Sequence, residues 1–267
     1  MSIVAGCDVG SLTSKAVIMK KGRIIGKSII KSKPRPQDSA KAVMTEALSA
    51  AGLSLEDIEY CIGTGYGREK IAFVKEAKSE IPCHGRGARW LLPSARTVID
   101  IGGQDCKTMV IDADGHVARF AATDRCASGT GRFLDVMAKV LGVGVDELGH
   151  LTEKSKAPIM LASTCTAWAQ ADVIKYINSG VPIEDIGAGI NAAMAGRVAI
   201  LVNAVKPEGD LFMTGGVAKN VGVVSTLEKL VGRKIKKARK ADPQIAGAIG
   251  AALFAMEKVN GKRRDKK

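Results

Sequence analysis

The sequence is poor in aromatic residues, which make up only 4% of its 267 residues. It contains no C-x-x-C pair, no G-x-x-x-x-G-K-[ST] motif and no G-x-G-x-x-G motif, so neither a cysteine-rich zinc site, a P-loop nor a Rossmann site is predicted. No apolar run reaches the roughly 18 residues of a membrane span, and the first residues do not resemble a signal peptide. We therefore expect a cytoplasmic protein that does not enter a membrane.

The net charge is +13, from 40 basic and 27 acidic residues. Two basic runs, at 233–240 and 262–267, contribute to it, and neither contains an aromatic residue. Surfaces that bind nucleic acid combine cations with aromatic side chains that stack on bases, so no nucleic-acid partner is predicted. The charge favours solvated surfaces or attraction to an acidic partner protein.

Six cysteines are present, and in a cytosolic chain of this size disulfides are not expected. Cys7, Cys61 and Cys106 lie in apolar, strand-like stretches and are expected to be small buried thiols. The sequence indicates no clear role for Cys83, which precedes His84.

A series of elements occurs twice along the chain. It consists of a strand, an Asp-x-Gly turn, a strand, a turn and a third strand, and it starts near residues 3 and 97. Such a repeat predicts two similar domains that face each other across a cleft. Asp-x-Gly is common, so two unrelated hairpins are the alternative, but the matching order of three strands favours the repeat.

Further elements are predicted from apolar spacing and from the glycines and prolines that end helices. Strands are expected at 58–62 and at the start of 211–220, where a Gly-Gly turn and a helix follow. Helices are expected at 36–51, 67–78, 84–92, 133–141, 167–178, 183–205 and 243–259.

The two glycine turns have the composition of phosphate-binding loops, because such turns leave backbone N–H groups close to a ligand. Gly102 and Gly103 are expected to supply donors from the second loop. In the first loop the expected donors, with a positive charge from the last residue, are Gly10, Ser11, Leu12, Thr13, Ser14 and Lys15.

Catalytic residues are predicted beside these loops. Asp8, Asp100 and Asp105 are expected at strand ends near the phosphates, where a Mg²⁺ ion would relieve the repulsion. Gln104 is neutral and long enough to orient a water, so we predict that it positions the attacking water. For either loop alone, an ordinary hairpin turn is the better interpretation. The two loops and the Gly215-Gly216 turn together favour binding of ATP or ADP.

With these three loops the chain resembles the actin-like ATPase superfamily, which includes sugar and acetate kinases and heat-shock chaperones. The resemblance implies an α/β protein with two similar actin-like (ribonuclease H-like) domains and an interdomain nucleotide cleft. It also implies that the nucleotide is contacted by Gly215, Gly216, Lys219 and Gln244.

The same resemblance implies a domain division. The first domain would comprise residues 1–95 and the second residues 96–243, which carry both of the cysteines discussed next. The last helix, at about 244–259, would pack back on the first domain, and residues 260–267 would form a basic tail.

Cys126 and Cys165 each lie just before a predicted helix, where the helix dipole stabilises a thiolate. A [4Fe-4S] cluster usually takes four cysteines, so two per chain suffice if a symmetric dimer shares one cluster. On these residues alone, two ordinary helix-capping thiols are the better interpretation, because 39 residues separate them and no cluster motif is present.

Four motifs together alter that interpretation, because they resemble the activators of 2-hydroxyacyl-CoA dehydratases and the ATPase subunits of benzoyl-CoA reductases. They are the residues 99–105, 126–135, 163–166 and 213–220. The resemblance implies that Cys126 and Cys165 ligate one [4Fe-4S] cluster shared by a homodimer. Gln170 stands where an acidic residue is expected in that family.

The resemblance also implies an activity. Ferredoxin or flavodoxin would supply one electron, and ATP would change the angle between the domains. The dimer would then dock on an acyl-CoA dehydratase or reductase component, and hydrolysis would make the transfer one-way. Three alternatives stay open: a permanent subunit of a benzoyl-CoA reductase, a small-molecule kinase of the same fold, and a nucleotide-dependent assembly protein. No acceptor-binding insertion for a kinase is visible.

Overall fold

Two five-stranded sheets form the framework of the protein. The computed structural model describes residues 2–123, 129–162, 165–238 and 240–264, of which residues 262–264 are described by their backbone alone. In the order β3-β2-β1-β4-β5, the first sheet contains β1 (Ile3–Val9), β2 (Thr13–Lys20), β3 (Arg23–Lys31), β4 (Tyr60–Thr64) and β5 (Glu76–Ala77). In the order β10-β9-β6-β7-β8, the second contains β6 (Ala95–Ile101), β7 (Cys106–Ile111), β8 (Val117–Ala122), β9 (Asp210–Thr214) and β10 (Ile235–Lys236).

Both sheets are built in the same way. Three consecutive strands pair antiparallel, β1-β2-β3 in one sheet and β6-β7-β8 in the other. The first strand of each series then pairs in parallel with a later strand, β1 with β4 and β6 with β9, and that strand carries a short parallel edge strand. The repeat in the sequence is therefore a duplicated fold, and the prediction of an α/β protein with two similar halves is confirmed.

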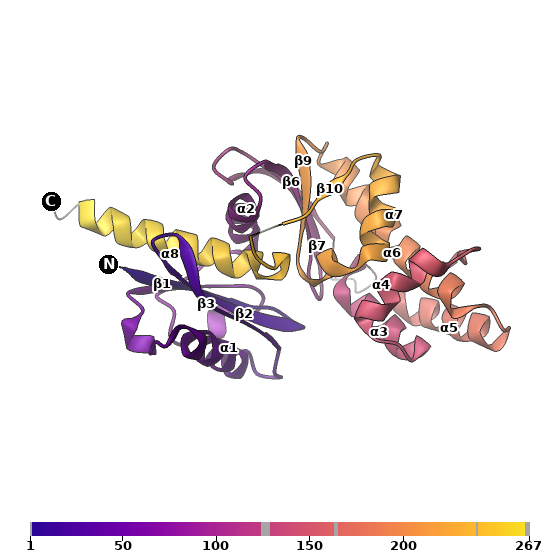
Figure 1. The fold of residues 1–267 in the computed structure, drawn as a ribbon, viewed down its shortest axis with the longest axis horizontal. Helices are drawn as coiled ribbons and strands as arrows, with labels where there is room; N and C mark the ends of the chain where they lie inside the picture. The colour runs from indigo at the N-terminus through magenta and orange to yellow at the C-terminus, as the bar shows by residue number, and fades with distance from the viewer. Residues whose placement is uncertain (1, 124–128, 163–164, 239, 265–267) are drawn as a thin grey trace.

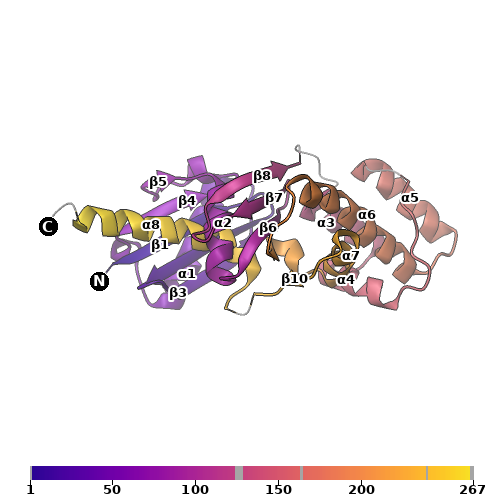
Figure 2. The ribbon, with the colours of Figure 1, turned by 90° about the horizontal axis from the view of Figure 1, so that it is seen from above.

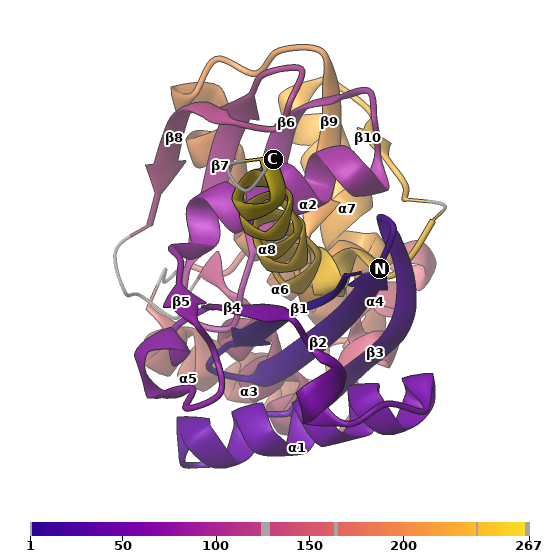
Figure 3. The ribbon, with the colours of Figure 1, turned by 90° about the vertical axis from the view of Figure 1, so that its left-hand side faces the viewer.

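Helices cover the sheets in layers. Helix α1 (Pro36–Ala51) packs on the first sheet (Figure 1). The far side of the second sheet carries α3 (Gly131–Leu141), α4 (Val145–Lys154), α5 (Thr166–Asn178), α6 (Ile183–Ala204) and α7 (Val221–Val231) (Figures 1 and 2). Helices α2 (Glu80–Leu91) and α8 (Ala246–Arg264) lie between the two sheets (Figure 3). The central strands β1 and β6 are thus buried almost throughout, which explains their apolar sequences.

The two middle helices cross with their backbones in contact. A Cβ atom on Gly87 of α2 would overlap the carbonyl oxygen of Ala246, and one on Gly250 of α8 would overlap the carbonyl oxygen of Cys83. The contact is thus the same viewed from either helix, as a local two-fold relation between the halves requires. Only glycine permits helices to approach this closely.

Helix α6 is the one helix, in the part of the chain that the structure describes, whose length and composition would suit a membrane span. About 67% of its most apolar window is buried inside the protein. It packs against α4 and α7 as a core helix, which accounts for its composition.

Two features differ from the sequence predictions. The helix predicted at 67–78 is wrong, because this segment forms a short 3₁₀ turn (Arg68–Lys70) and then strand β5. The amides of Lys75 and Lys78 donate to the carbonyls of Cys61 and Gly63, so pairing with the edge of β4 outweighs helical spacing. Helix α4 was not predicted.

Candidate functional site

A cleft of about 880 Å³ opens between the two halves, at the ends of β1 and β6. Its lining comes from the loops that follow β1, β6 and β9, from α3 and from the start of α4. The two turns predicted to bind phosphate therefore face one cavity from opposite sides. This volume is in the range of small-molecule and cofactor sites.

The two glycine turns have matching geometry. The amide of Gly10 donates to the carbonyl of Thr13 at 3.1 Å, and the amide of Gly102 donates to the carbonyl of Asp105 at 3.0 Å. Within the described residues, no hydrogen bond is found for the intervening amides of Ser11, Leu12, Gly103 and Gln104. Each loop thus presents two adjacent N–H groups, which is the arrangement that binds an anion.

The two loops also touch each other across the cleft. A Cβ atom on Gly103 would come within 2.6 Å of Ser11 Oγ and of Leu12 Cγ. These distances are far shorter than ordinary contacts, so a side chain at position 103 would force Ser11 and Leu12 to move.

Asp8 and Asp100 hold equivalent places in the two halves. Each is buried at the end of a central strand, lines the cleft and stands opposite a lysine of the next strand, Asp8 opposite Lys15 and Asp100 opposite Lys107. Lys15 Nζ lies 3.2 Å from Asp8 Oδ2. A buried carboxylate is tolerated when such a counter-charge is present.

His84, on α2, provides the counter-charge for Asp100. Its Nδ1 lies 3.1 Å from Asp100 Oδ1 and 3.0 Å from Thr214 Oγ1, and the Thr214 hydroxyl donates to Asp100 Oδ1 at 2.9 Å. Burial lowers the pKa of His84, but the charge of Asp100 outweighs it and the pKa is raised. Burial raises the pKa of Asp100, but the charge and hydrogen bond of His84 outweigh it and hold the pKa well below its usual range.

Lys107 forms a second buried ionic group beside the cleft. Its Nζ lies 2.9 Å from Glu80 Oε1 and 2.7 Å from Asp105 Oδ2. Burial lowers the pKa of Lys107, but the negative charges of Asp100, Glu80 and Asp105 outweigh burial and raise it. Lys107 therefore stays charged and fixes Asp105 in the second loop.

The third loop follows β9 and closes one end of the cleft. Gly215 has φ = 84°, a conformation that suits glycine. Lys219 Nζ lies 3.0 Å from Asp242 Oδ2, so this lysine is held at the rim. Gln244 Nε2 donates to Thr13 Oγ1 at 3.2 Å and ties the 3₁₀ turn before α8 (Pro243–Ile245) to the first loop.

Most of the residues predicted from the sequence meet in this cleft. Ser14 does not line it, because its side chain is fully buried with its hydroxyl 2.9 Å from Ser32 Oγ, and its backbone pairs with Val9. The predicted residues that line the cleft are Asp8, Gly10, Ser11, Leu12, Thr13, Lys15, Asp100, Gly102, Gly103, Gln104, Asp105, Gly215, Gly216, Lys219 and Gln244.

The donor set fits a hydrated Mg²⁺ ion. This ion prefers oxygen ligands and usually keeps several waters while contacting one or two carboxylates and the phosphates of a substrate. Asp8, Asp100 and Asp105 direct carboxylates to the cleft from both halves, next to loops with open N–H groups.

The prediction that Cys7, Cys61 and Cys106 are buried thiols is confirmed. Cys7, Cys61, Cys83 and Cys106 are buried, and burial raises the pKa of Cys61 and of Cys83 to about 12. Cys165 is exposed and is the N-cap residue of α5, so its sulfur is accessible from outside. Cys126 lies outside the described residues.

The second phosphate-type loop is bonded to the start of α3. The amide of Gly131 donates to the carbonyl of Gly102 at 2.8 Å, and the amide of Arg132 donates to the carbonyl of Gly103 at 3.3 Å. The helix that follows the Cys126 segment in the chain is thus attached by backbone bonds to the loop that lines the cleft.

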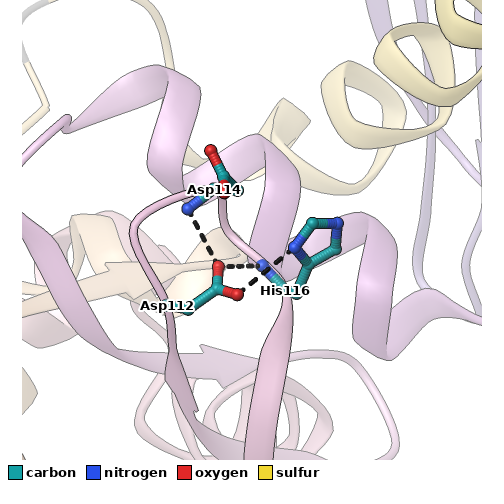
Figure 4. Close-up of side chains that lie close together, drawn as sticks. All are labelled: Asp112, Asp114 and His116. Carbon is teal, nitrogen blue, oxygen red and sulfur yellow. Dashed lines mark hydrogen bonds and ion pairs between the residues drawn. The ribbon is translucent and has the colours of Figure 1, made fainter.

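One other cluster of chemical groups occurs among the described residues. Asp112, Asp114 and His116 lie together in the turn between β7 and β8 (Figure 4). Asp112 Oδ1 accepts hydrogen bonds from the amides of Asp114 and His116, each at 2.9 Å. These bonds are those of a local turn and account for the cluster, so we assign no metal to it.

Sequence reasoning missed the buried ionic residues of the site, of which Glu80 and His84 line the cleft and Lys107 lies beside it. All three act through contacts between α2 and the second sheet, and none belongs to a glycine loop. No motif in the sequence marks them, because Cys83-His84 has no recognisable pattern and the contacts of His84 form only when α2 packs against the second sheet.

Two matched loops with open N–H groups, facing each other across a cleft between duplicated halves, define an ATPase of the actin-like fold. The profile of the BadF/BadG/BcrA/BcrD ATPase family matches residues 5–255, and the chain belongs to this family. The resemblance inferred from its motifs is thereby confirmed, as is the prediction of an ATPase.

Relatives agree with this assignment. The (R)-2-hydroxyglutaryl-CoA dehydratase activating ATPase of Acidaminococcus fermentans is 42% identical over 95% of this chain and 97% of its own. The activator of the 2-hydroxyisocaproyl-CoA dehydratase from Clostridium difficile, solved with bound ADPNP, is 38% identical with a TM-score of 0.94, covering 99% of this chain and 98% of that one. A ROK family glucokinase from Streptomyces griseus shares the fold, with a TM-score of 0.60 at 13% identity over 96% of this chain and all of its own.

Proposed function

We propose that the protein is an ATP-dependent one-electron transfer activator. In this proposal a homodimer shares one [4Fe-4S] cluster and passes a low-potential electron to a CoA-ester dehydratase or reductase component, with ATP hydrolysis as the driving force. The observation that carries the proposal is the position of Cys165, an exposed thiol at the start of a helix in the same half as a nucleotide loop. The relatives named above, which are dehydratase activators, support it.

Each glycine loop has a defined role in nucleotide binding. The open amides of the loops at 10–13 and 102–105 would hold the phosphates from both sides, and the Gly215-Gly216 turn would support the base and ribose. Gln104 lines the cleft and would orient the attacking water. Asp8, Asp100 and Asp105 would hold a hydrated Mg²⁺ at the phosphates.

Nucleotide and cysteines would communicate through the second half. Any movement of the loop at 102–105 acts directly on α3, because the first two residues of α3 bond to that loop. Helix α3 in turn packs against α5, which starts at Cys165. ATP can bias this movement only by binding the two conformations with different affinity. The cluster, held by Cys126 and Cys165 of both subunits, would supply the low-potential electron.

The surface of α5 supports a dimer at this end. Only Ala169 and Val173 of this helix are buried, while Trp168 is 70% exposed and Met160, in the preceding segment, is 84% exposed. Large apolar side chains near a thiol favour a covered interface.

The proposal also includes the domain division at 1–95 and 96–243, which places both cysteines in the second domain. Ferredoxin or flavodoxin is the proposed electron donor, and the cytoplasm the proposed location.

The test is to count iron and sulfide in protein purified without oxygen and to measure its mass. The expected result is a homodimer with about four iron atoms per dimer, and loss of iron in Cys126→Ser and in Cys165→Ser with ATP binding retained. Cys61→Ala, which alters a buried strand thiol, is the matched control and should keep its iron. A monomer without iron that still binds ATP would exclude the electron-transfer role and leave only the ATPase activity. A stable complex with a second type of ATPase subunit would favour the benzoyl-CoA reductase alternative.

A further inference from the structure

His84 is a buried histidine between the two sheets. It belongs to α2, one of the two helices between the sheets, and only 6% of it is exposed. By the local two-fold relation of the helix crossing, Cys83 corresponds to Ala246 and Gly87 to Gly250, so the counterpart of His84 is Gly247. The duplicated fold therefore offers two equivalent positions, one filled by an imidazole and the other by a residue without a side chain.

The imidazole lies between the two strand-end carboxylates. On one side its Nδ1 is 3.1 Å from Asp100 Oδ1. On the other side, a Cβ atom on Gly247 would lie 2.9 Å from His84 Nε2 and 3.0 Å from Asp8 Oδ2, so both of these atoms border the same small space. A side chain at position 247 would therefore press on the ring of His84 and on the carboxylate of Asp8.

We propose that His84 is a positioning residue that fixes Asp8 and Asp100 relative to each other, and that Gly247 is required to leave room for it. This inference rests on the proposed function, in which both carboxylates hold a hydrated Mg²⁺ at the nucleotide phosphates. The distance between the two carboxylates decides where such an ion can be held. Because His84 is part of the α2–α8 crossing, it ties that distance to the contact between the halves.

The neighbouring charges do not replace it. Lys15 pairs with Asp8 but comes from the first sheet alone. Lys107 acts on Asp100 through its charge, but its ion pairs are with Glu80 and Asp105, and it comes from the second sheet alone. Among the residues that the structure describes, His84 is thus the side chain that stands between the carboxylates of both halves.

Two substitutions separate the two sides of the ring. In His84→Asn the amide nitrogen takes about the place of Nδ1 and keeps the contacts with Asp100 and Thr214, whereas in His84→Gln it takes about the place of Nε2 and keeps the side that faces Asp8. A third variant, Gly247→Ala, disturbs the same space without altering the histidine. His116→Gln, in an exposed turn, is the matched control.

The measurement is binding of ATP in an excess of chelator and then across a magnesium titration, with the kcat and KM of hydrolysis beside it. In all three variants we expect the magnesium concentration at half-saturation to rise about 10–100-fold, as happens when an outer-shell partner of a metal ligand is lost. ATP without magnesium, in an excess of chelator, should bind within about twofold of the wild-type affinity. In the hydrolysis assay, kcat should fall by a larger factor than KM rises.

Either of two outcomes would overturn the inference. One is an unchanged magnesium dependence in His84→Asn and His84→Gln. The other is an equal loss of affinity with and without magnesium, which would mean that His84 only supports the fold. If the wild-type protein itself bound no magnesium-ATP, the proposed function would fail first, so the two failures are distinguishable.

Discussion

Replacing Gly250 by alanine is expected to destabilise the protein, although this change usually stabilises a helix. Alanine is favoured over glycine inside a helix by about 1 kcal/mol. At Gly250 the added Cβ would overlap the carbonyl oxygen of Cys83 and come within 2.8 Å of its Cα. These atoms are helical backbone and cannot rotate away as a side chain can, so the helices must separate.

Overpacking of a tight contact costs about 1–3 kcal/mol. The matched control is Gly196→Ala in α6, where a Cβ would meet nothing within 4 Å. This control should gain up to about 1 kcal/mol. The same gain applies at Gly250, so the free energies of unfolding of the two variants should differ by the overpacking cost alone, about 1–3 kcal/mol.

Urea unfolding followed by circular dichroism measures this difference, provided that the slope of free energy against urea is unchanged. Gly87→Ala, on the other side of the crossing, should behave like Gly250→Ala. The reasoning is refuted if Gly250→Ala unfolds at the same or a higher urea concentration than the wild type.

Two further predictions concern the buried charges. Lys107→Met leaves Glu80 and Asp105 without their cation and should lower the free energy of unfolding by about 3–5 kcal/mol, measured by urea unfolding; a loss under about 1 kcal/mol would contradict a buried ionic group. The pKa of Asp100 is lower in the folded protein than in the unfolded chain, so its stabilising effect is complete above the ordinary pKa of about 3.9 and is lost as the pH falls toward the folded value. In Asp100→Asn, the free energy of unfolding should therefore decrease less steeply below about pH 4 than it does in the wild type. An equally steep decrease in the variant would count against this account.

The duplicated fold was predictable because its signals are local. Each half opens with a strand, an aspartate and a glycine turn, and the period between Asp8 and Asp100 is visible in the sequence. The cleft followed from the same signals, since matched loops in a duplicated fold must face each other.

What could not be predicted depends on contacts between distant elements. The role of His84 arises only when α2 packs between the sheets and brings it to Asp100. The segment at 67–78 has a helical pattern, but the open edge of β4 offers carbonyls that it pairs with instead. Ser14 has the composition of a loop donor, yet the pairing of β1 with β2 extends far enough to bury it.

The glycine crossing of α2 and α8 has a mechanical consequence. Two helices in direct backbone contact have little room to slide, but they can still rotate about the point where they touch. A rotation about a fixed point displaces nearby atoms little and distant atoms in proportion to their separation from it. Helix α5 lies at the outer end of the second half (Figure 2), so a small turn at this pivot would carry Cys165 much farther than it would shift the aspartates beside it.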